Sequence, residues 1–138
     1  MKRYIVGSLL VLGVFLMAAC KTTAVVQTKE IQTQRAGDTV IALLNEKGEL
    51  AMGKNQYILA FRSASNNEPI DVGAVTLGAA MAMPGMAPMT STVELEPAGA
   101  KGQYAVKSDF AMSGAWKFEV RWDGPAGQGV TSFSTNVR

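Results

Sequence analysis

Residues 116–122, WKFEVRW, alternate bulky apolar residues with charged ones at every position. Successive side chains of a β-strand point to opposite faces, so this alternation predicts a strand with one buried and one solvent-facing side. The buried side would carry Trp116, Phe118, Val120 and Trp122. The opposite side would carry Lys117, Glu119 and Arg121. We therefore expect this strand to line an inter-sheet core.

Six further short runs with strand character surround this one, separated by turn signals rich in Gly, Pro and Asn. They are residues 39–44, 57–63, 72–80, 92–96, 104–110 and 130–137. Seven short strands at this spacing, with no long helical period, are typical of an antiparallel sandwich. The chain has a single cysteine, so the inter-sheet disulfide of many immunoglobulin domains cannot form. The sequence predicts one all-β, immunoglobulin-like sandwich over residues 37–138.

The N-terminal region has the pattern of an export signal. Residues 1–3 carry two positive charges and the sixteen residues 4–19 carry none. A spanning helix needs about 20 apolar residues, so this run fits a signal peptide better. Ala18 and Ala19 stand directly before Cys20, which resembles the lipobox of bacterial lipoproteins, with Met17 in place of the usual Leu. The alternative is an uncleaved anchor with an incidental cysteine.

Cleavage before Cys20 would give an exported lipoprotein, anchored in the membrane of the cell envelope and facing the periplasm. Loss of Lys2 and Arg3 leaves eleven basic and eleven acidic residues, so the mature chain is neutral. Nucleic-acid binding needs a basic patch and is not expected. Residues 1–19 would be the signal peptide and residues 20–36 the lipidated cysteine with a polar tether, although a weak extra strand is an alternative for the tether.

A methionine-rich stretch, residues 80–89, AMAMPGMAPM, follows the third predicted strand. Its four methionines fall within nine residues: Met81, Met83, Met86 and Met89. Prolines at this spacing exclude a helix or a central strand and indicate a rigid loop. Pro84 and Gly85 fit the centre of a type II turn, which would bring the α-carbons of Met83 and Met86 within about 7 Å.

Strand parity predicts where the methionines gather. If each strand reverses direction, the loops after the first, third and fifth predicted strands open at one end of the sandwich. Met52 falls in the first of these loops, the four methionines of residues 80–89 in the second, and Met112 in the third. Thioethers are soft, neutral ligands that suit Cu(I) and Ag(I). The expected metal ligands are Met81, Met83, Met86, Met89 and Met112.

Other chemistry finds little support in the residues. The chain has no histidine, and its one cysteine is the expected lipidation site, so a Zn(II) or Cu(II) site and cysteine or histidine catalysis are not expected. No serine lies in a nucleophile-elbow pattern, and the glycine-rich turns lack phosphate-loop spacing. We expect a protein that is not an enzyme, with Cu(I) as the ion that its methionines would take.

Four short motifs occur in series along the predicted sandwich. They are Gly53-x-Asn55, AMAMPGM at residues 80–86, Gly102-x-Tyr104 and Met112-Ser113-Gly114-x-Trp116. In this order and spacing the chain resembles the YtkA-like family over residues 37–137. The resemblance implies an immunoglobulin-like sandwich and an association with heavy-metal efflux and copper-handling systems of the envelope. Relatives often carry a histidine beside the methionine motif, whereas this chain has none.

Three functions fit these observations. The first is a lipid-anchored module that binds Cu(I) or Ag(I) and hands it to an envelope metal-efflux or copper-handling protein. The second is a structural or interaction domain whose methionine-rich pole docks another envelope protein, since methionine surfaces adapt to many partners. The third is an enzyme accessory without a site of its own. Whether the sulfur atoms point outward together or inward into the core distinguishes the first two.

Overall fold

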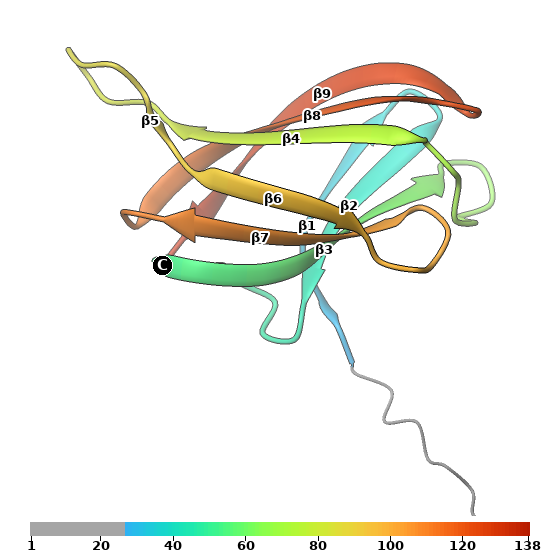
Figure 1. The fold of residues 1–138 in the computed structure, drawn as a ribbon, viewed down its shortest axis with the longest axis horizontal. Helices are drawn as coiled ribbons and strands as arrows, with labels where there is room; N and C mark the ends of the chain where they lie inside the picture. Colours follow the sequence, from blue (N-terminus) through green and yellow to red (C-terminus); the bar gives the residue numbers. More distant parts are fainter. Residues whose placement is uncertain (1–26) are drawn as a thin grey trace, which may run out of the picture.

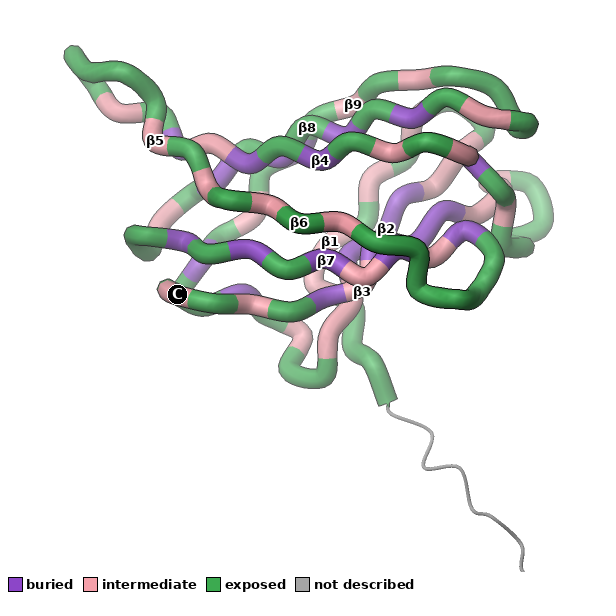
Figure 2. The backbone as a smooth tube through the Cα atoms, in the orientation of Figure 1, coloured by how far each residue is buried: buried purple, intermediate pink, exposed green. Residues whose placement is uncertain are grey.

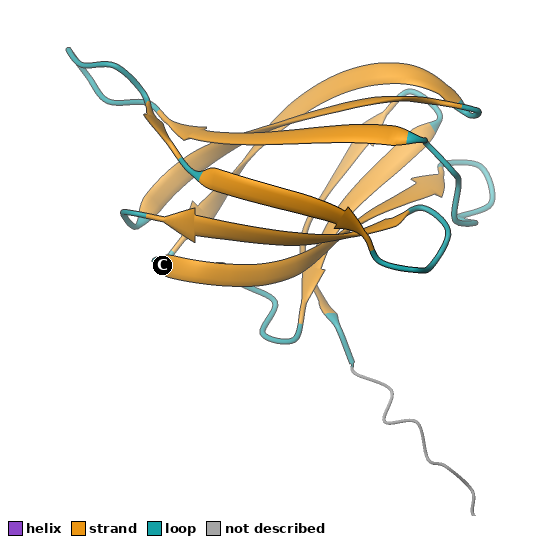
Figure 3. Ribbon diagram, in the orientation of Figure 1, coloured by secondary structure: helices purple, strands orange, loops and turns teal. Residues whose placement is uncertain are grey.

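The computed structural model describes residues 27–138 and places them in nine antiparallel strands that form two sheets (Figure 1). In spatial order the first sheet consists of β1 (Lys29–Ala36), β2 (Thr39–Asn45), β3 (Gly53–Ser63), β7 (Gln103–Phe110) and β6 (Thr92–Pro97). The second consists of β5 (Met89–Thr90), β4 (Ala74–Met81), β8 (Gly114–Gly124) and β9 (Gly127–Val137). Figure 3 shows only strands and loops in this part of the chain.

The predicted all-β sandwich is confirmed. Without β1 and β5, the spatial orders are β2-β3-β7-β6 and β4-β8-β9. Numbered along the chain, these seven strands pair as first, second, fifth and fourth, and as third, sixth and seventh. This is the strand order of a constant-type immunoglobulin domain, ABED on CFG.

Strand β1 lies before residue 37, where the sandwich is expected to begin. Residues 29–36, for which the sequence leaves open a tether or a weak extra strand, form a strand that pairs with β2 from Lys29 opposite Asn45 to Ala36 opposite Thr39. Ile31 packs against the core, whereas half of the residues of the strand are exposed. A strand with one solvated side and few apolar residues reads as a polar linker in the sequence. The domain therefore begins at Lys29 or earlier, and not at residue 37.

The core lies between the sheets, along the inner faces of β3, β7 and β8. The four residues predicted to face inward from β8 are buried, and the three charged ones between them are exposed, as Figure 2 shows by the alternation of purple and green. Aromatic rings join the sheets: the ring centroids of Phe110 and Trp116 lie 5.0 Å apart, and those of Phe61 and Trp122 5.7 Å apart. The rigid sandwich can hold loops in fixed positions at its two ends.

The export signal and Cys20 lie outside the described residues, so they stay predictions. Within residues 27–138, no helix is long and apolar enough to cross a membrane.

Candidate metal centre

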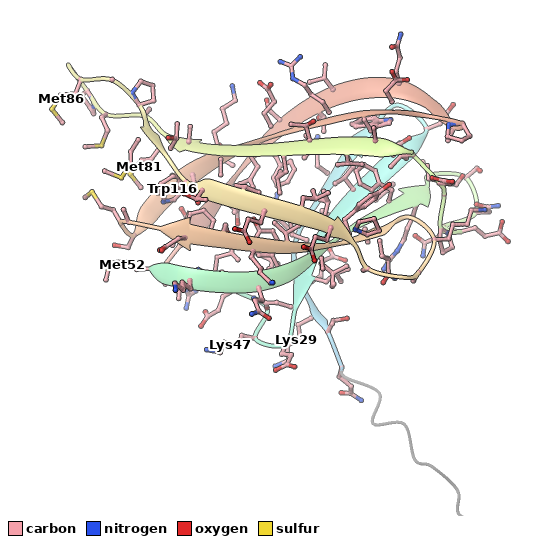
Figure 4. The ribbon with its side chains drawn as sticks, in the orientation of Figure 1. Lys29, Lys47, Met52, Met81, Met86 and Trp116 are labelled. Carbon is pink, nitrogen blue, oxygen red and sulfur yellow. The ribbon has the colours of Figure 1, made fainter. Side chains whose placement is uncertain are left out.

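Three loops bring the methionines to one end of the sandwich. Gly53 of β3 pairs with Phe110 of β7, and the short loop after Phe110 leads into Gly114 of β8. β8 pairs in turn with the end of β4, where the methionine hairpin begins. We call this the methionine end, because it carries every methionine of residues 27–138: Met52, Met81, Met83, Met86, Met89 and Met112. Figure 4 shows Met52, Met81 and Met86 at this end.

Three of these methionines extend the inner face of β4. Met81 is 9% exposed and continues the buried row of Leu77 and Ala79. Met83 lies two residues further on and is half-buried against the core. Met89 of β5 stands directly opposite Met81 in the β4–β5 ladder, and residues so paired place their β-carbons about 4.5–5.5 Å apart on one face. Met81, Met83 and Met89 form the inner methionine set.

The predicted turn at the hairpin tip is present. The Met86 N–H donates to the Met83 carbonyl at 3.1 Å, and Gly85 has φ 71°, the positive value that the third residue of a type II turn requires. The two side chains nevertheless differ, because Met83 is half-buried whereas Met86 is 66% exposed. In Figure 4 the tip carries Met86 outward, away from the sandwich. Met86 is thus joined to the inner set by its backbone and lies open to solvent.

The β7–β8 loop, which carries Met112, approaches the inner set at Gly114. The buried indole of Trp116 donates its Nε1–H to the Met112 carbonyl at 3.0 Å, which fixes the loop to the core. Two residues after Met112, a β-carbon on Gly114 would lie 2.7 Å from the Met81 methyl carbon. The glycine therefore leaves the space that the Met81 thioether fills. Met112 itself is 43% exposed.

Met52 was placed at this end by strand parity but was not among the expected ligands. Its N–H donates to the Arg138 carbonyl at 2.6 Å, and its side chain is 64% exposed. The Asn55 side chain accepts from the Ala51 N–H and donates to the Ala51 carbonyl, which fixes the loop just before Met52. In the sequence, the Gly53-x-Asn55 motif marks the loop that holds Met52.

The β4–β5 hairpin and the β7–β8 loop offer neutral donors, whereas the ion pair of Glu49 with Arg138 lies beside Met52. Residues 72–93 and 110–116 carry no charged side chain. Within the described residues, no group of three or more His, Cys, Asp or Glu side chains could hold a metal. Thioether sulfur is therefore the strongest soft donor at this end, and hard cations such as Mg²⁺ or Ca²⁺ find no carboxylate cage there.

The question whether the sulfur atoms point inward or outward has a divided answer. Met81 is a core residue, Met83 and Met89 are half-buried, and Met86 and Met112 are exposed. The thioethers at the methionine end thus differ in solvent exposure, from side chains that are open to solvent to one that is buried at the edge of the core.

Comparison with known proteins places the fold in a family. Residues 33–121 match the YtkA-like family. The chain belongs to the YtkA-like family. The matched region contains the methionine hairpin and the loop from Met112 to Trp116, so the resemblance drawn from the four motifs is confirmed. No curated protein matches the sequence.

One solved structure supports the sandwich fold at low sequence identity. A copper-bound variant of FetP from uropathogenic Escherichia coli strain F11 superposes on this YtkA-like domain with a TM-score of 0.51 at 9% identity. The match covers 80% of this chain and 97% of the FetP chain. A DUF4426 family protein from Pseudomonas aeruginosa PAO1 has a TM-score of 0.47 at 12% identity, over 76% of this chain and 94% of its own. At these identities the FetP match supports the sandwich fold alone.

Proposed function

We propose that this YtkA-like protein is a lipid-anchored module of the cell envelope that binds Cu(I), or Ag(I), at its methionine end. One observation carries the proposal. Met81 and Met89 stand opposite each other at the rim of the core, Met83 packs against the same core, and the stretches of sequence that carry them have no charged residue. Three thioethers in such surroundings form a soft and neutral ligand set.

The chemistry of this ligand set favours monovalent soft ions. A thioether needs no deprotonation, so binding would persist at low pH, where thiolates and imidazoles are protonated. Half-burial of Met83 and Met89 would shield the ion from water, while the exposed Met86 and Met112 would supply further sulfurs during entry or release. The copper-bound protein that shares the sandwich fold is an E46Q variant of FetP, and its copper supports the proposal of a copper-handling role for this domain.

The proposed anchor leaves the methionine end accessible. Figure 1 shows the described chain entering the domain at the start of β1, well away from the hairpin between β4 and β5. A lipid at Cys20 would therefore hold the membrane-proximal side and leave the hairpin free for a partner. Because lipoproteins of this kind carry more than one acyl chain, such an anchor would be stable. The partner would be an envelope metal-efflux or copper-handling protein.

A second function is favoured by a different observation. The described residues expose four large apolar side chains, and three of them are Met52, Met86 and Met112 at the methionine end. Adaptable apolar side chains gathered in one place suit protein contacts as well as metals. In this alternative the methionine end docks another envelope protein without binding an ion.

Anaerobic Cu(I) titration against a chromophoric chelator tests the proposal. We expect about one tight equivalent of Cu(I) and no measurable Zn(II) binding. The double variant Met83→Leu/Met86→Leu keeps side-chain volume but removes two sulfurs, so its Cu(I) affinity should fall sharply, with stability changed by less than about 1.5 kcal/mol per site.

The matched control is Met52→Leu, which removes an exposed sulfur at the same end outside the proposed ligands and should leave Cu(I) affinity unchanged. Absence of Cu(I) binding in the parent protein would favour the docking function. A collapse of stability in the double variant would show that its two methionines serve packing.

A further inference from the structure

Trp116 lies where two loops of the methionine end meet the core. It belongs to the inner face of β8 and is the largest of the fully buried side chains. Phe110 of the first sheet packs against it edge to face, with the ring centroids 5.0 Å apart. Two segments that carry methionines also adjoin this indole, so its surroundings include sulfur as well as core.

Met81 adjoins Trp116 from the β4 side. The last pair of the antiparallel β4–β8 ladder is Ala80 opposite Lys117, and the next residues of the two strands are Met81 and Trp116, both on the inner face. Residues that stand opposite each other in this way hold their β-carbons about 4.5–5.5 Å apart. The Met81 methyl carbon reaches further to Gly114, where an added β-carbon would lie 2.7 Å from it. The Met81 thioether therefore extends over β8 next to the indole.

The loop of Met112 adjoins the same indole at its nitrogen. The Trp116 Nε1–H donates to the Met112 carbonyl at 3.0 Å, so this edge of the ring is directed to the β7–β8 loop. Figure 4 shows Trp116 and Met81 at one end of the sandwich. The indole thus lies between a thioether of the β4–β5 hairpin and the loop that carries an exposed thioether.

An indole at this place offers a cation more than packing. The faces of the ring carry partial negative charge and attract a cation within about 6 Å of the ring centroid, and tryptophan attracts it more strongly than tyrosine or phenylalanine. The attraction grows where water is excluded, and Trp116 is fully buried. Thioethers are neutral ligands, so Cu(I) or Ag(I) bound by them keeps its positive charge. No charged residue in 72–93 or 110–116 compensates that charge.

We propose that the indole of Trp116 forms the floor of the ion site, with Cu(I) or Ag(I) held by the inner methionine set against the face of the ring. This inference rests on the proposed metal function, and it adds an aromatic group to a site that was built from sulfur alone. Trp116 acts in two ways. Its ring attracts the ion, and its Nε1–H fixes the loop of Met112 beside the site.

The two tryptophans of the chain provide a matched test. Trp122 lies near the other end of β8, is also buried, and stands opposite Gly129 of β9. Trp122→Phe leaves Trp116 as the single indole fluorophore, and Trp116→Phe leaves Trp122. A silver ion in contact with an indole quenches its fluorescence by the heavy-atom effect, so each variant reports on one end of the strand.

The full chain of each variant, purified in detergent, is titrated with Ag(I) without chloride. Trp122→Phe should lose emission in step with the first bound equivalent, and Trp116→Phe should keep its emission. Phenylalanine is the weaker cation–π partner and has no N–H, so Trp116→Phe should bind Ag(I) at least about tenfold more weakly than Trp122→Phe. Urea unfolding of the metal-free variants compares their stability, while the emission of Trp122→Phe is read with Trp116 intact.

Elemental analysis after dialysis counts the bound silver and separates the possible failures. Bound Ag(I) that leaves the emission of Trp122→Phe unchanged, or that quenches both variants alike, would overturn the floor and leave the methionine site in place. Equal Ag(I) affinity of the two variants would overturn it as well. A chain that binds no Ag(I) would refute the metal function itself, and this inference with it.

Discussion

Among single residues, Tyr57 has an unusual electrostatic position between the two sheets. The Ser108 hydroxyl donates to the Tyr57 hydroxyl at 3.2 Å, and both residues are buried. Burial raises the pKa of Tyr57 to about 12, and the hydrogen bond from Ser108 opposes that shift. Tyr57 also meets Phe118 edge to face, so its ring belongs to the core that supports the methionine end.

This pKa predicts a loss of stability at alkaline pH. An unfolded tyrosine ionises near pH 10, whereas Tyr57 in the folded protein ionises near pH 12. The unfolded state therefore releases its proton first, and the stabilisation present below pH 10 is lost as the pH rises to about 12. The free energy of unfolding should fall by up to roughly 2–3 kcal/mol for this residue. Urea unfolding at pH 9 and pH 11.5 measures the change.

Tyr57→Phe is the control for this prediction. Burial, and secondly the charge of Asp71, also raise the pKa of Tyr104, and that contribution remains in both proteins. The difference between parent and variant thus isolates Tyr57. An identical alkaline loss in both proteins would contradict the assignment.

The burial of individual residues could be predicted only where they lie in regular strands. Period-two alternation assigned Trp116, Phe118 and their neighbours correctly, because strand geometry fixes side-chain direction. The same rule does not extend into the hairpin, where Met83 is half-buried and Met86 exposed on either side of one turn. Local sequence fixed the turn, but the depth of each sulfur depends on packing against β8 and the β7–β8 loop.

At the scale of elements, the motifs serve mainly to hold loops and strands together. Gly102-x-Tyr104 joins distant segments: the Gly102 carbonyl accepts from Phe61, and the Tyr104 hydroxyl donates to the Gly73 carbonyl at 2.7 Å. Trp116 holds the Met112 carbonyl in the same manner. The motifs that indicate the family therefore have structural roles in the sandwich, and they are weaker evidence for a ligand.

The contact between the β7–β8 loop and the end of β4 gives a test at this scale. In Gly114→Ala the new methyl group would displace the flexible end of Met81, and φ of 134° adds backbone strain. We expect a stability loss of roughly 1–3 kcal/mol together with a Cu(I) affinity lowered at least about tenfold. Urea unfolding and chelator competition measure the two effects.

Gly99→Ala is the matched control for this loop. Gly99 also has a positive φ, 80°, but its added methyl group would meet nothing, and it lies in the turn between β6 and β7. It should lose stability by a similar amount and keep its Cu(I) affinity. Unchanged Cu(I) affinity in Gly114→Ala would remove Met81 from the proposed site.

The sequence indicates β1 only as an alternative to a tether, and it does not indicate β5. Half of the residues of β1 are exposed, so its apolar periodicity is weak, although it supplies a partner for the edge of β2. β5 has only two residues and exists because the hairpin places Met89 opposite Met81. Both strands form because a partner strand pairs with them, and the local sequence pattern does not reveal that pairing.

For the whole molecule, antiparallel topology gathers the methionines and could be predicted in full. Because the seven predicted strands reverse direction at each connection, alternate loops lie at the same end of the sandwich. The additional strands β1 and β5 do not change which loops lie at which end. The position of the domain relative to the membrane depends instead on the proposed lipid at Cys20, which lies outside the described residues.

The anchor can be tested by intact-mass measurement of the membrane fraction. We expect a mature chain that begins at an acylated Cys20, because small residues precede it in a lipobox-like pattern. Cys20→Ser should leave an uncleaved or soluble exported protein. A mature chain whose Cys20 carries no lipid would rule out the anchor while leaving the metal proposal intact.

The central claim is that the methionine end is a soft-metal site, and a crystal structure with Ag(I) tests it most directly. Silver replaces Cu(I) at thioether ligands without oxidation chemistry, and its anomalous scattering locates the ion independently of the protein atoms. We predict one dominant silver peak bound by sulfurs of the inner set, Met81, Met83 and Met89. Silver held elsewhere, or none at the methionine end of a crystal grown with excess Ag(I), would contradict the account.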